Sequence, residues 1–494
     1  MQKKQTILVV ASLLVVVLSV TLAYFTAQII GKGKDVSVTS TTLQIVFTDS
    51  DGAISGSNIE PGWSDTKTFT VENNSKSEYK YNIVIKDLLN TFVTEGYLQY
   101  KITSTNDGYN MTEFKDIPKS ETATDTILAY SVSIPVGVTQ SYTIEFKYSN
   151  DESVDQSDDM GKKLSGTLFI TEGTEDPNKT LYNQLLADKS TVLTRTDFSS
   201  VLSTDNTNTL YTSTEGSKTV YYFAGNATDN WVKFGKNASN QDLYWRIIRT
   251  NSDGSVRLLY HGTSTTTTDA YIGTSAFNSS YDNIAYVSYM YGSLGSISSA
   301  RENTNNSTIK TTIDNWYKDN LNTNYGKYLS TTAVYCNDRS ISSDSINFGA
   351  FTRLGTNKTP SYDCAATEDK FTVDTSTGNG KLTYPIALMT ADEVSFAGGL
   401  YGANTPTWYY YNSVNGSSTG SKFWWLLSPL DSSTSGSSMF IVRGSSNPGR
   451  LNYNYVYSNN GVRPALSLKS CVKYSSGDGS AENPYTIKET ETGC

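Results

Sequence analysis

Histidine is almost missing from this sequence. The 494 residues contain a single one, His261. A zinc-peptidase motif of the H-E-x-x-H type needs two histidines one helical turn apart, so this chain cannot build one. His261 follows an apolar strand, and we expect it to be a structural residue rather than a catalytic base.

Positive charge is also in short supply. The chain has 39 Lys and Arg against 48 Asp and Glu, which gives a formal net charge of -9. The basic residues are dispersed along the sequence, whereas proteins that bind nucleic acid gather them into a groove or patch that follows the phosphates. We therefore expect no nucleic-acid partner.

Cysteine is rare, and its four positions are informative. They are Cys336, Cys364, Cys471 and Cys494, a number that suits an exported protein with disulfides. Three pairings are possible, and proximity in the sequence favours 336 with 364 and 471 with 494. Each bridge would be worth roughly 3 to 4 kcal/mol in the chain-entropy model. The competing interpretation, a Cys nucleophile, would need His261 as its base.

The N-terminus carries a long uncharged run, residues 6–30, preceded by Lys3 and Lys4. As a helix this run would span about 37 Å at about 1.5 Å per residue, enough for a bilayer core of about 30 Å. The positive-inside rule then places the remainder of the chain outside the cytoplasm. Residues 1–30 are thus predicted to be either a cleaved signal peptide or a retained membrane anchor.

Tyrosine is abundant: the chain has 35 Tyr against 17 Phe. Twenty-five of these tyrosines lie after residue 200, together with six of the seven tryptophans and all four cysteines. The two halves of the chain therefore differ in kind, which predicts a multidomain protein with a boundary near residue 200.

Residues 35–172 show apolar and polar residues in alternation, as in 142–146 and 166–170, with turn clusters between them. Several short alternating segments of this kind predict an all-β sandwich. The sequence DSDG at 49–52 suggests calcium, but the EF-hand spacing fails after it, and a solvated hairpin turn explains it better. We expect no metal and no cofactor.

The sequence LAYFTA at 22–27 and the pieces IEPG at 59–62 and TFTVEN at 68–73 resemble camelysin-type and biofilm-matrix fibre proteins of Gram-positive bacteria. This resemblance implies export through a dedicated signal peptidase and a fibre-forming β-domain. The family has been labelled a metallopeptidase, but the residues needed for that activity are not found here.

The segment 173–216 is predicted to be a linker, because it begins with a polar stretch that interrupts regular secondary structure and ends in a Ser/Thr/Asn-rich run. Leu181, Leu185 and Leu186 stand at helical spacing and predict one short helix within it. At the other end of the chain, residues 472–494 are predicted to form a C-terminal tail.

Residues 217–471 mix strand and helix patterns. Residues 243–249 and 256–260 read as two strands of a hairpin joined by a turn at 251–254, and residues 309–317 read as a helix. Thr390 is a candidate N-cap for a second helix.

The pieces YWRIIR, CNDRS, WWLLSP and GVRPALSL, in this order, resemble an uncharacterised extracellular domain of Gram-positive gut bacteria. The final piece also resembles the last strand of C-type-lectin-like folds, which implies a compact α+β domain. Relatives often carry Arg where this chain has Leu427, so any salt bridge of that Arg is absent here.

A row of tyrosines precedes the final strand. Tyr453, Tyr455 and Tyr457 share one parity and are expected to point to one face of an extended segment, with 452, 454 and 456 pointing to the other. Tyrosine with Asn and Ser is the composition of antibody paratopes. The candidate binding residues are Tyr453, Asn454, Tyr455, Tyr457, Asn459, Trp408, Tyr409, Tyr410 and Tyr411.

These observations predict a non-enzymatic, adhesin-like protein at the cell exterior that binds a glycan or a protein. It would contact the membrane only if the N-terminal helix is retained. Two alternatives remain open. The first is a structural subunit that polymerises into an extracellular matrix or fibre, and the second is a peptidase-like enzyme.

Overall fold

A computed structural model gives the fold of the chain. The residues it describes are 36–40, 43–49, 53–55, 59–266, 270–341, 347–405, 423–433, 436–444 and 447–494. They divide into two compact units, Met1–Pro177 and Asn178–Cys494, each treated separately below. The expected N-terminal helix lies outside the described residues, and among those described no helix is long and apolar enough to span a membrane.

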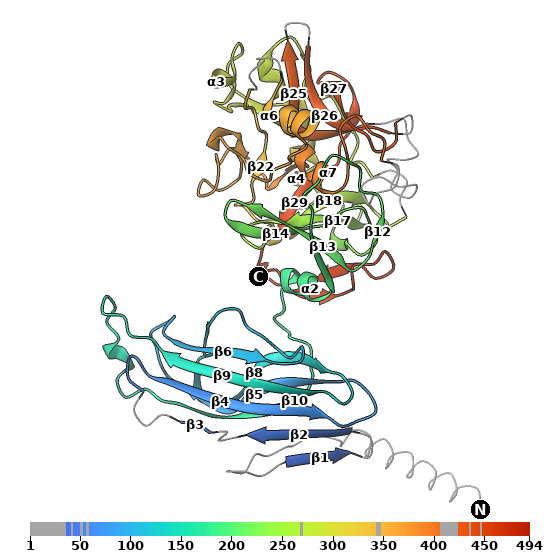
Figure 1. The fold of residues 1–494 in the computed structure, drawn as a ribbon. Coiled ribbons are helices and arrows are strands. Elements are labelled where there is room, and N and C mark those ends of the chain that lie inside the picture. The colour runs from blue at the N-terminus through green and yellow to red at the C-terminus, as the bar shows by residue number, and fades with distance from the viewer. Residues whose placement is uncertain are drawn as a thin grey trace, which may run out of the picture. The chain divides into compact units, whose positions relative to one another are not determined.

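The first unit consists of two antiparallel sheets in a sandwich-like arrangement (Figure 1). One sheet has the order β1 (Val36–Ser40), β2 (Leu43–Asp49), β4 (Ser64–Asn73), β9 (Thr139–Tyr148), β6 (Leu98–Ser104), β7 (Lys115–Asp116). The other has the order β3 (Ala53–Ser55), β10 (Leu164–Glu172), β5 (Tyr79–Asn90), β8 (Ser120–Ile134). Alternate residues of both sheets enter one apolar core, as the period-two pattern predicts.

The second unit contains a ten-stranded sheet. Seven strands follow in the order β11 (Thr191–Thr194), β13 (Thr209–Glu215), β14 (Lys218–Tyr222), β17 (Asp242–Thr250), β16 (Trp231–Lys236), β31 (Tyr485–Ile487), β30 (Tyr474–Ser476). β18 (Val256–Gly262) pairs with β17 and β29 (Pro464–Leu468), and β29 pairs with β24 (Ile386–Leu388). The predicted β17–β18 hairpin is confirmed.

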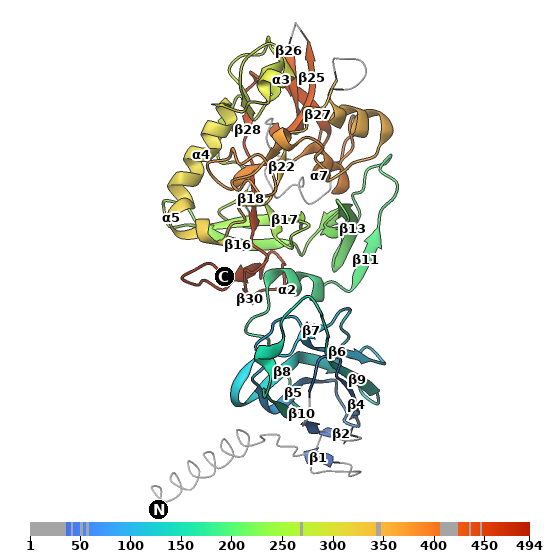
Figure 2. The ribbon, with the colours of Figure 1, turned by 90° about the vertical axis from the view of Figure 1, so that its left-hand side faces the viewer.

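A five-stranded sheet lies at one end of this unit, where Figures 1 and 2 both show β25, β26 and β27 side by side. Its order is β19 (Thr274–Ser275), β28 (Asn460–Gly461), β25 (Trp424–Ser433), β26 (Gly436–Val442), β27 (Leu451–Tyr455). β27 is therefore an edge strand, and every residue of its neighbour β26 is buried.

Short helices and two-residue strands connect the sheets. The helices are α2 (Leu181–Ala187), α3 (Ile297–Ala300), α4 (Thr308–Asn320), α5 (Asn322–Tyr325), α6 (Gly349–Phe351) and α7 (Ala391–Phe396). The short strand pairs are β12 (Asp205–Asn206) with β15 (Asn226–Ala227), β20 (Met290–Tyr291) with β21 (Asn305–Asn306), and β22 (Tyr335–Cys336) with β23 (Lys370–Phe371).

The two helices expected from the sequence are present. α4 covers the predicted 309–317 and buries Ile309, Ile313 and Tyr317 on one face. α7 begins after Thr390, whose side chain forms a capping box with Glu393.

The boundaries differ from those expected. The segment 173–216 contains α2 as predicted, but β11 and β13 belong to the large sheet, so the second unit begins at Asn178 rather than 217. The C-terminal segment is also integrated, because β30 and β31 extend the same sheet and Tyr485 is fully buried. Both segments are built from strands of two to seven residues, which are too short for a clear period-two signal.

Candidate binding surface

The tyrosine row, defined as Tyr453, Tyr455 and Tyr457, lies on the edge strand β27 and the turn that follows it. Leu451 and Val456 are fully buried and anchor this segment in the core. The three tyrosines are 39%, 44% and 50% exposed. The sequence prediction that they point outward is therefore consistent with the structure.

Two rings of the tyrosine row lie against each other. The ring centroids of Tyr455 and Tyr457 are 5.8 Å apart and their planes differ by 10°. Tyr281, from the loop after β19, is 45% exposed and its ring centroid is 4.8 Å from that of Tyr457. Sequence analysis missed Tyr281, because no local pattern marks it and it lies more than 170 positions before its neighbour.

The asparagines between the tyrosines bind the backbone of their own strand. Asn452 Oδ1 accepts a hydrogen bond from the Tyr453 amide at 2.8 Å, and Asn454 Oδ1 accepts one from the Tyr455 amide at 3.0 Å. Asn454 also bonds Ser458 Oγ at 3.1 Å, which holds the turn after the strand. These bonds occupy amides that an unprotected edge strand would offer to another strand.

The remaining candidate residues fall into two groups. Asn459 is exposed in the turn beside the tyrosine row. Asn454 is half-buried, and its side chain forms hydrogen bonds within the edge strand and the turn rather than facing outward. Trp408, Tyr409, Tyr410 and Tyr411 lie outside the described residues.

All four cysteines form disulfides. Cys336 is bonded to Cys364 and Cys471 to Cys494, with Cα atoms 5.8 and 5.4 Å apart. The pairing favoured by sequence proximity is confirmed. Two disulfides are typical of proteins that reside in an oxidising, extracytoplasmic compartment.

The cysteines and His261 do not form a nucleophile and base. No free thiol remains, and the His261 side chain is completely buried with its ring centroid 4.3 Å from that of Trp231. Burial lowers the pKa of His261 well below its usual value, and the nearby charges of Arg246 and Arg463 lower it further. The imidazole is therefore neutral and inaccessible.

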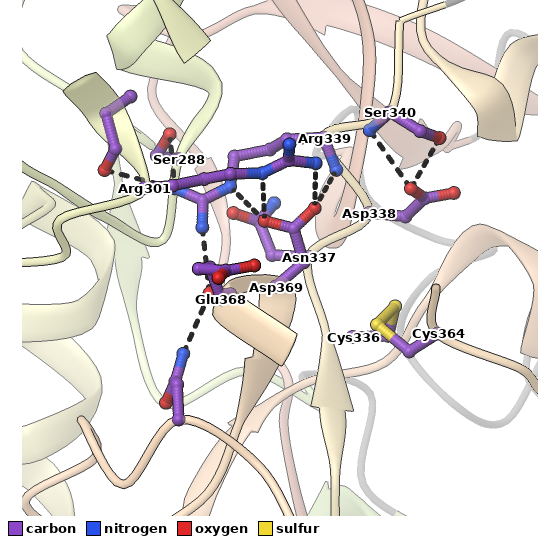
Figure 3. Close-up of polar contacts among 12 residues, drawn as sticks. Ser288, Arg301, Cys336, Asn337, Asp338, Arg339, Ser340, Cys364, Glu368 and Asp369 are labelled. Carbon is purple, nitrogen blue, oxygen red and sulfur yellow. Dashed lines mark hydrogen bonds and ion pairs between the residues drawn. A yellow bond between two sulfur atoms is a disulfide. The ribbon is translucent and has the colours of Figure 1, made fainter. Parts of the chain in front are cut away.

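The CNDRS sequence at 336–340 forms a structural centre next to the first disulfide (Figure 3). Arg339 is completely buried, and its Nε lies 2.8 Å from Asp369 Oδ1. Arg301 binds the same carboxylate through two nitrogens, at 3.1 and 2.7 Å. Asn337 donates to the backbone oxygen of Leu427 at 2.8 Å, so the motif joins segments that are far apart in the sequence.

A second ionic network fixes α7. Glu393 Oε1 lies 3.1 Å from Arg249 Nε and 3.0 Å from Arg257 Nε, and Arg249 also binds Glu215 at 2.9 Å. Burial alone would raise the pKa of Glu215, but the charge of Arg249 and hydrogen bonds from Arg249 and Ser252 give a net lowering. Removing one member of such a buried network leaves an uncompensated charge, which strongly destabilises the fold. We therefore assign this network a structural role.

Metal binding has no support within the described ranges. No three His, Cys, Asp or Glu side chains there lie close enough together to hold an ion. The DSDG sequence at 49–52, which we expected to be a hairpin turn rather than a calcium site, falls largely outside those ranges.

Comparison with known proteins gives no family for this chain. No protein-family model matches it, and no curated protein matches it. A solved structure, that of a ruminal GH26 endo-beta-1,4-mannanase, shows 15% identity over 28% of this chain and 29% of its own, with a TM-score of 0.15. The chain thus spans less than a third of that structure, and a likeness of this size says nothing about fold or activity.

Proposed function

We propose that the protein is a non-enzymatic extracellular surface protein whose second unit binds a glycan or protein partner through the tyrosine row and Tyr281. One observation carries this proposal: four tyrosines, each 39% to 50% exposed, gather on one edge of the five-stranded sheet. Large aromatic groups kept in water in one place are typical of interaction sites.

The chemistry of the row suits recognition. A tyrosine ring offers a large contact area with only two χ angles to freeze, and its hydroxyl can bond to a partner or to water. Ring contacts between Tyr281, Tyr455 and Tyr457 restrict these side chains before any partner arrives, which reduces the entropy cost of binding.

The expected cell location agrees with this function. Residues 1–30 would export the chain, either as a cleaved signal peptide or as a membrane anchor, and the two disulfides suit the oxidising exterior. The second unit would then be the C-type-lectin-like α+β domain that the GVRPALSL sequence resembles, with its binding face on the segment that precedes β29 in the sequence.

A matrix or fibre subunit remains the second candidate, since the sandwich has open edges. The long edge strand β8 is poorly suited to strand addition, however. Its pairing with β5 shifts register four times, Ser131 has a φ of 46°, and Glu121 and Asp125 add charge to its exposed half. Bulges and charges of this kind protect edges from pairing with other chains.

The test is binding of the purified protein to glycan and host-protein arrays, followed by affinity measurement for any hit. The double variant Tyr455→Ala/Tyr457→Ala should weaken binding at least about tenfold, which corresponds to about 1.4 kcal/mol. Val192→Ala is the control, because this side chain is 52% exposed on β11, in the ten-stranded sheet. Affinity equal for the two variants would refute the proposed surface.

A further inference from the structure

The loop before α3 brings another exposed apolar side chain to the end of the second unit that carries the tyrosine row. Leu294 is 52% exposed, more than any of the four tyrosines. It lies between β20 and α3, and Figures 1 and 2 both show α3 at the same end of the unit as β25 and β26. A single exposed leucine needs no explanation, whereas one that adjoins other exposed apolar groups enlarges a patch.

A hydrogen bond of Asn283 holds the loop of Leu294 next to Tyr281. Asn283 Oδ1 accepts this bond from the Gly295 amide at 3.1 Å. Gly295 is the residue directly after Leu294. Tyr281 stands two residues before Asn283, and its ring contacts Tyr457 of the tyrosine row.

A second bond of Asn283 reaches the strand beside the tyrosine row. Its backbone oxygen accepts a hydrogen bond from Ser437 Oγ at 2.9 Å. The backbone oxygen of Ser437, on β26, accepts one from the amide of Val456, which alternates with the tyrosines in the sequence. Leu294, Tyr281 and the tyrosine row therefore lie close together at the surface, and we call them the aromatic patch.

The segments that build the aromatic patch contain almost no charge. Residues 271–281, 283–300 and 451–462 include no Asp, Glu, Lys or Arg, although 18% of the chain is charged. Asp282 is the one charged residue between the first two segments. Depletion of charged residues and enrichment in tyrosine distinguish the centre of a protein–protein interface from the rest of a protein surface. The composition of the patch therefore favours a protein partner.

Few amide or carboxylate groups of these segments are left to bind a sugar. A sugar ring carries several hydroxyl groups, and each one that loses water on binding needs a hydrogen-bond partner. The side-chain oxygens of Asn452, Asn454 and Asn283 already accept backbone amides. Of the amide and carboxylate residues in these segments, only Asp282 and Asn459 are exposed. An apolar side chain of a protein partner needs no such bonds and is stabilised by contact with the exposed rings.

We propose that the partner of the aromatic patch is a protein that docks apolar side chains onto Leu294 and the tyrosine rings. This inference rests on the proposed function of the tyrosine row and narrows its partner from a glycan or a protein to a protein. The amides of Tyr453 and Tyr455 are bonded to neighbouring asparagines, so the partner contacts side chains rather than adding a strand to β27.

Two screens of the full chain test this inference. One uses a phage-displayed library of short random peptides, and the other uses a glycan array. We expect the library to yield peptides that share aromatic or aliphatic anchor residues and bind with a Kd of about 10 μM. The glycan array should yield no ligand that depends on the tyrosine row.

Variants locate the binding of the selected peptides. Leu294→Ala should weaken it about fivefold, and Tyr455→Ala/Tyr457→Ala should weaken it at least about tenfold. Val192→Ala is the matched control, because this aliphatic side chain is equally exposed but lies on β11, so the affinity should not change. A thermal melt of each variant confirms that it is folded.

The possible results separate this inference from the proposed function. A glycan whose affinity falls in Tyr455→Ala/Tyr457→Ala would overturn the protein partner and leave the proposed surface intact. Peptides whose affinity falls in that double variant but not in Leu294→Ala would show that Leu294 lies outside the contact area. No ligand from either screen, or ligands unaffected by both variants, would contradict the inference and the proposed function together.

Discussion

At the scale of single residues, the structure explains why the chain's one histidine is not a catalytic group. His261 is completely buried, and neither ring nitrogen has a hydrogen-bond partner among the described residues. Trp231 covers the ring, while Arg246 and Arg463 supply positive charge nearby. Burial and these charges therefore lower the pKa of His261 well below its ordinary value, which favours the neutral imidazole in the folded state.

This burial predicts a pH dependence with a defined sign. Because the folded pKa of His261 lies well below its ordinary value of 6.5, the unfolded chain binds more protons once the pH falls below 6.5. Stability from this residue is therefore full above pH 6.5 and is lost as the pH falls. Between pH 7.5 and 5.5 the loss should be about 1.4 kcal/mol.

Urea unfolding followed by tryptophan fluorescence can measure this loss, since six of the seven tryptophans lie after residue 200. His261→Leu is the comparison, because it removes the only imidazole of the chain and leaves other titrating groups in place. The difference in unfolding free energy between the two proteins should change with pH by the amount above. A constant difference would contradict a neutral, buried histidine.

At the scale of elements, sequence patterns predicted local secondary structure better than they predicted which strands pair. The pattern at residues 309–317 predicted α4, and the N-cap residue Thr390 predicted α7. The turn at 251–254 predicted the β17–β18 hairpin. The ten-stranded sheet could not be foreseen, because its strands come from residues 191 to 487 and some pair in parallel across the chain. Periodicity shows which face of a strand is buried but not which strand lies beside it.

The same limit applies to the candidate sites. Alternation, a local property, predicted that Tyr453, Tyr455 and Tyr457 are exposed together, but it could not show that Leu451, of the same parity, is fully buried. The contact of Tyr281 with Tyr457 depends on two distant segments, and no local pattern marks it. The role of Asn452 and Asn454 in protecting the strand edge could be identified only from the structure, because the sequence does not show whether an Asn in a strand faces a partner or bonds its own backbone.

The position of β27 against β26 gives a prediction at the element scale. A Cβ added at Gly436 would lie 2.8 Å from Cε1 of Tyr455, so this glycine makes room for the ring. Gly436→Ala should displace Tyr455, disturb its contact with Tyr457, and cost about 1 to 3 kcal/mol of stability.

A double-variant comparison isolates the contact. In a Tyr455→Ala background the clash is absent, so Gly436→Ala should there have little effect on the unfolding free energy. Chemical shifts of the Tyr457 ring should move in the single variant Gly436→Ala. An equal cost in both backgrounds would mean that the alanine acts on the backbone and not on the tyrosine.

At the scale of the whole molecule, the two compact units depend on different stabilising features. The first unit relies on a core shared by two sheets and contains no cysteine. The second unit has both disulfides, which close loops of 28 and 23 residues and fix the CNDRS segment and the C-terminal strands. Its ends would otherwise be held by short strands such as β30 and β31.

Reduction should therefore separate the units. Each disulfide contributes roughly 3 to 4 kcal/mol in the chain-entropy model, so a strong reductant should lower the melting temperature of the second unit by many degrees. The first unit should melt at the same temperature with or without reductant. Differential scanning calorimetry resolves the two transitions. The variant Cys471→Ser/Cys494→Ser should shift only the transition that accounts for most of the change in tryptophan fluorescence, since six of the seven tryptophans lie in the second unit. A shift of both transitions would show that the sandwich draws stability from the disulfide-bonded unit, and the two would then have to unfold as a coupled pair.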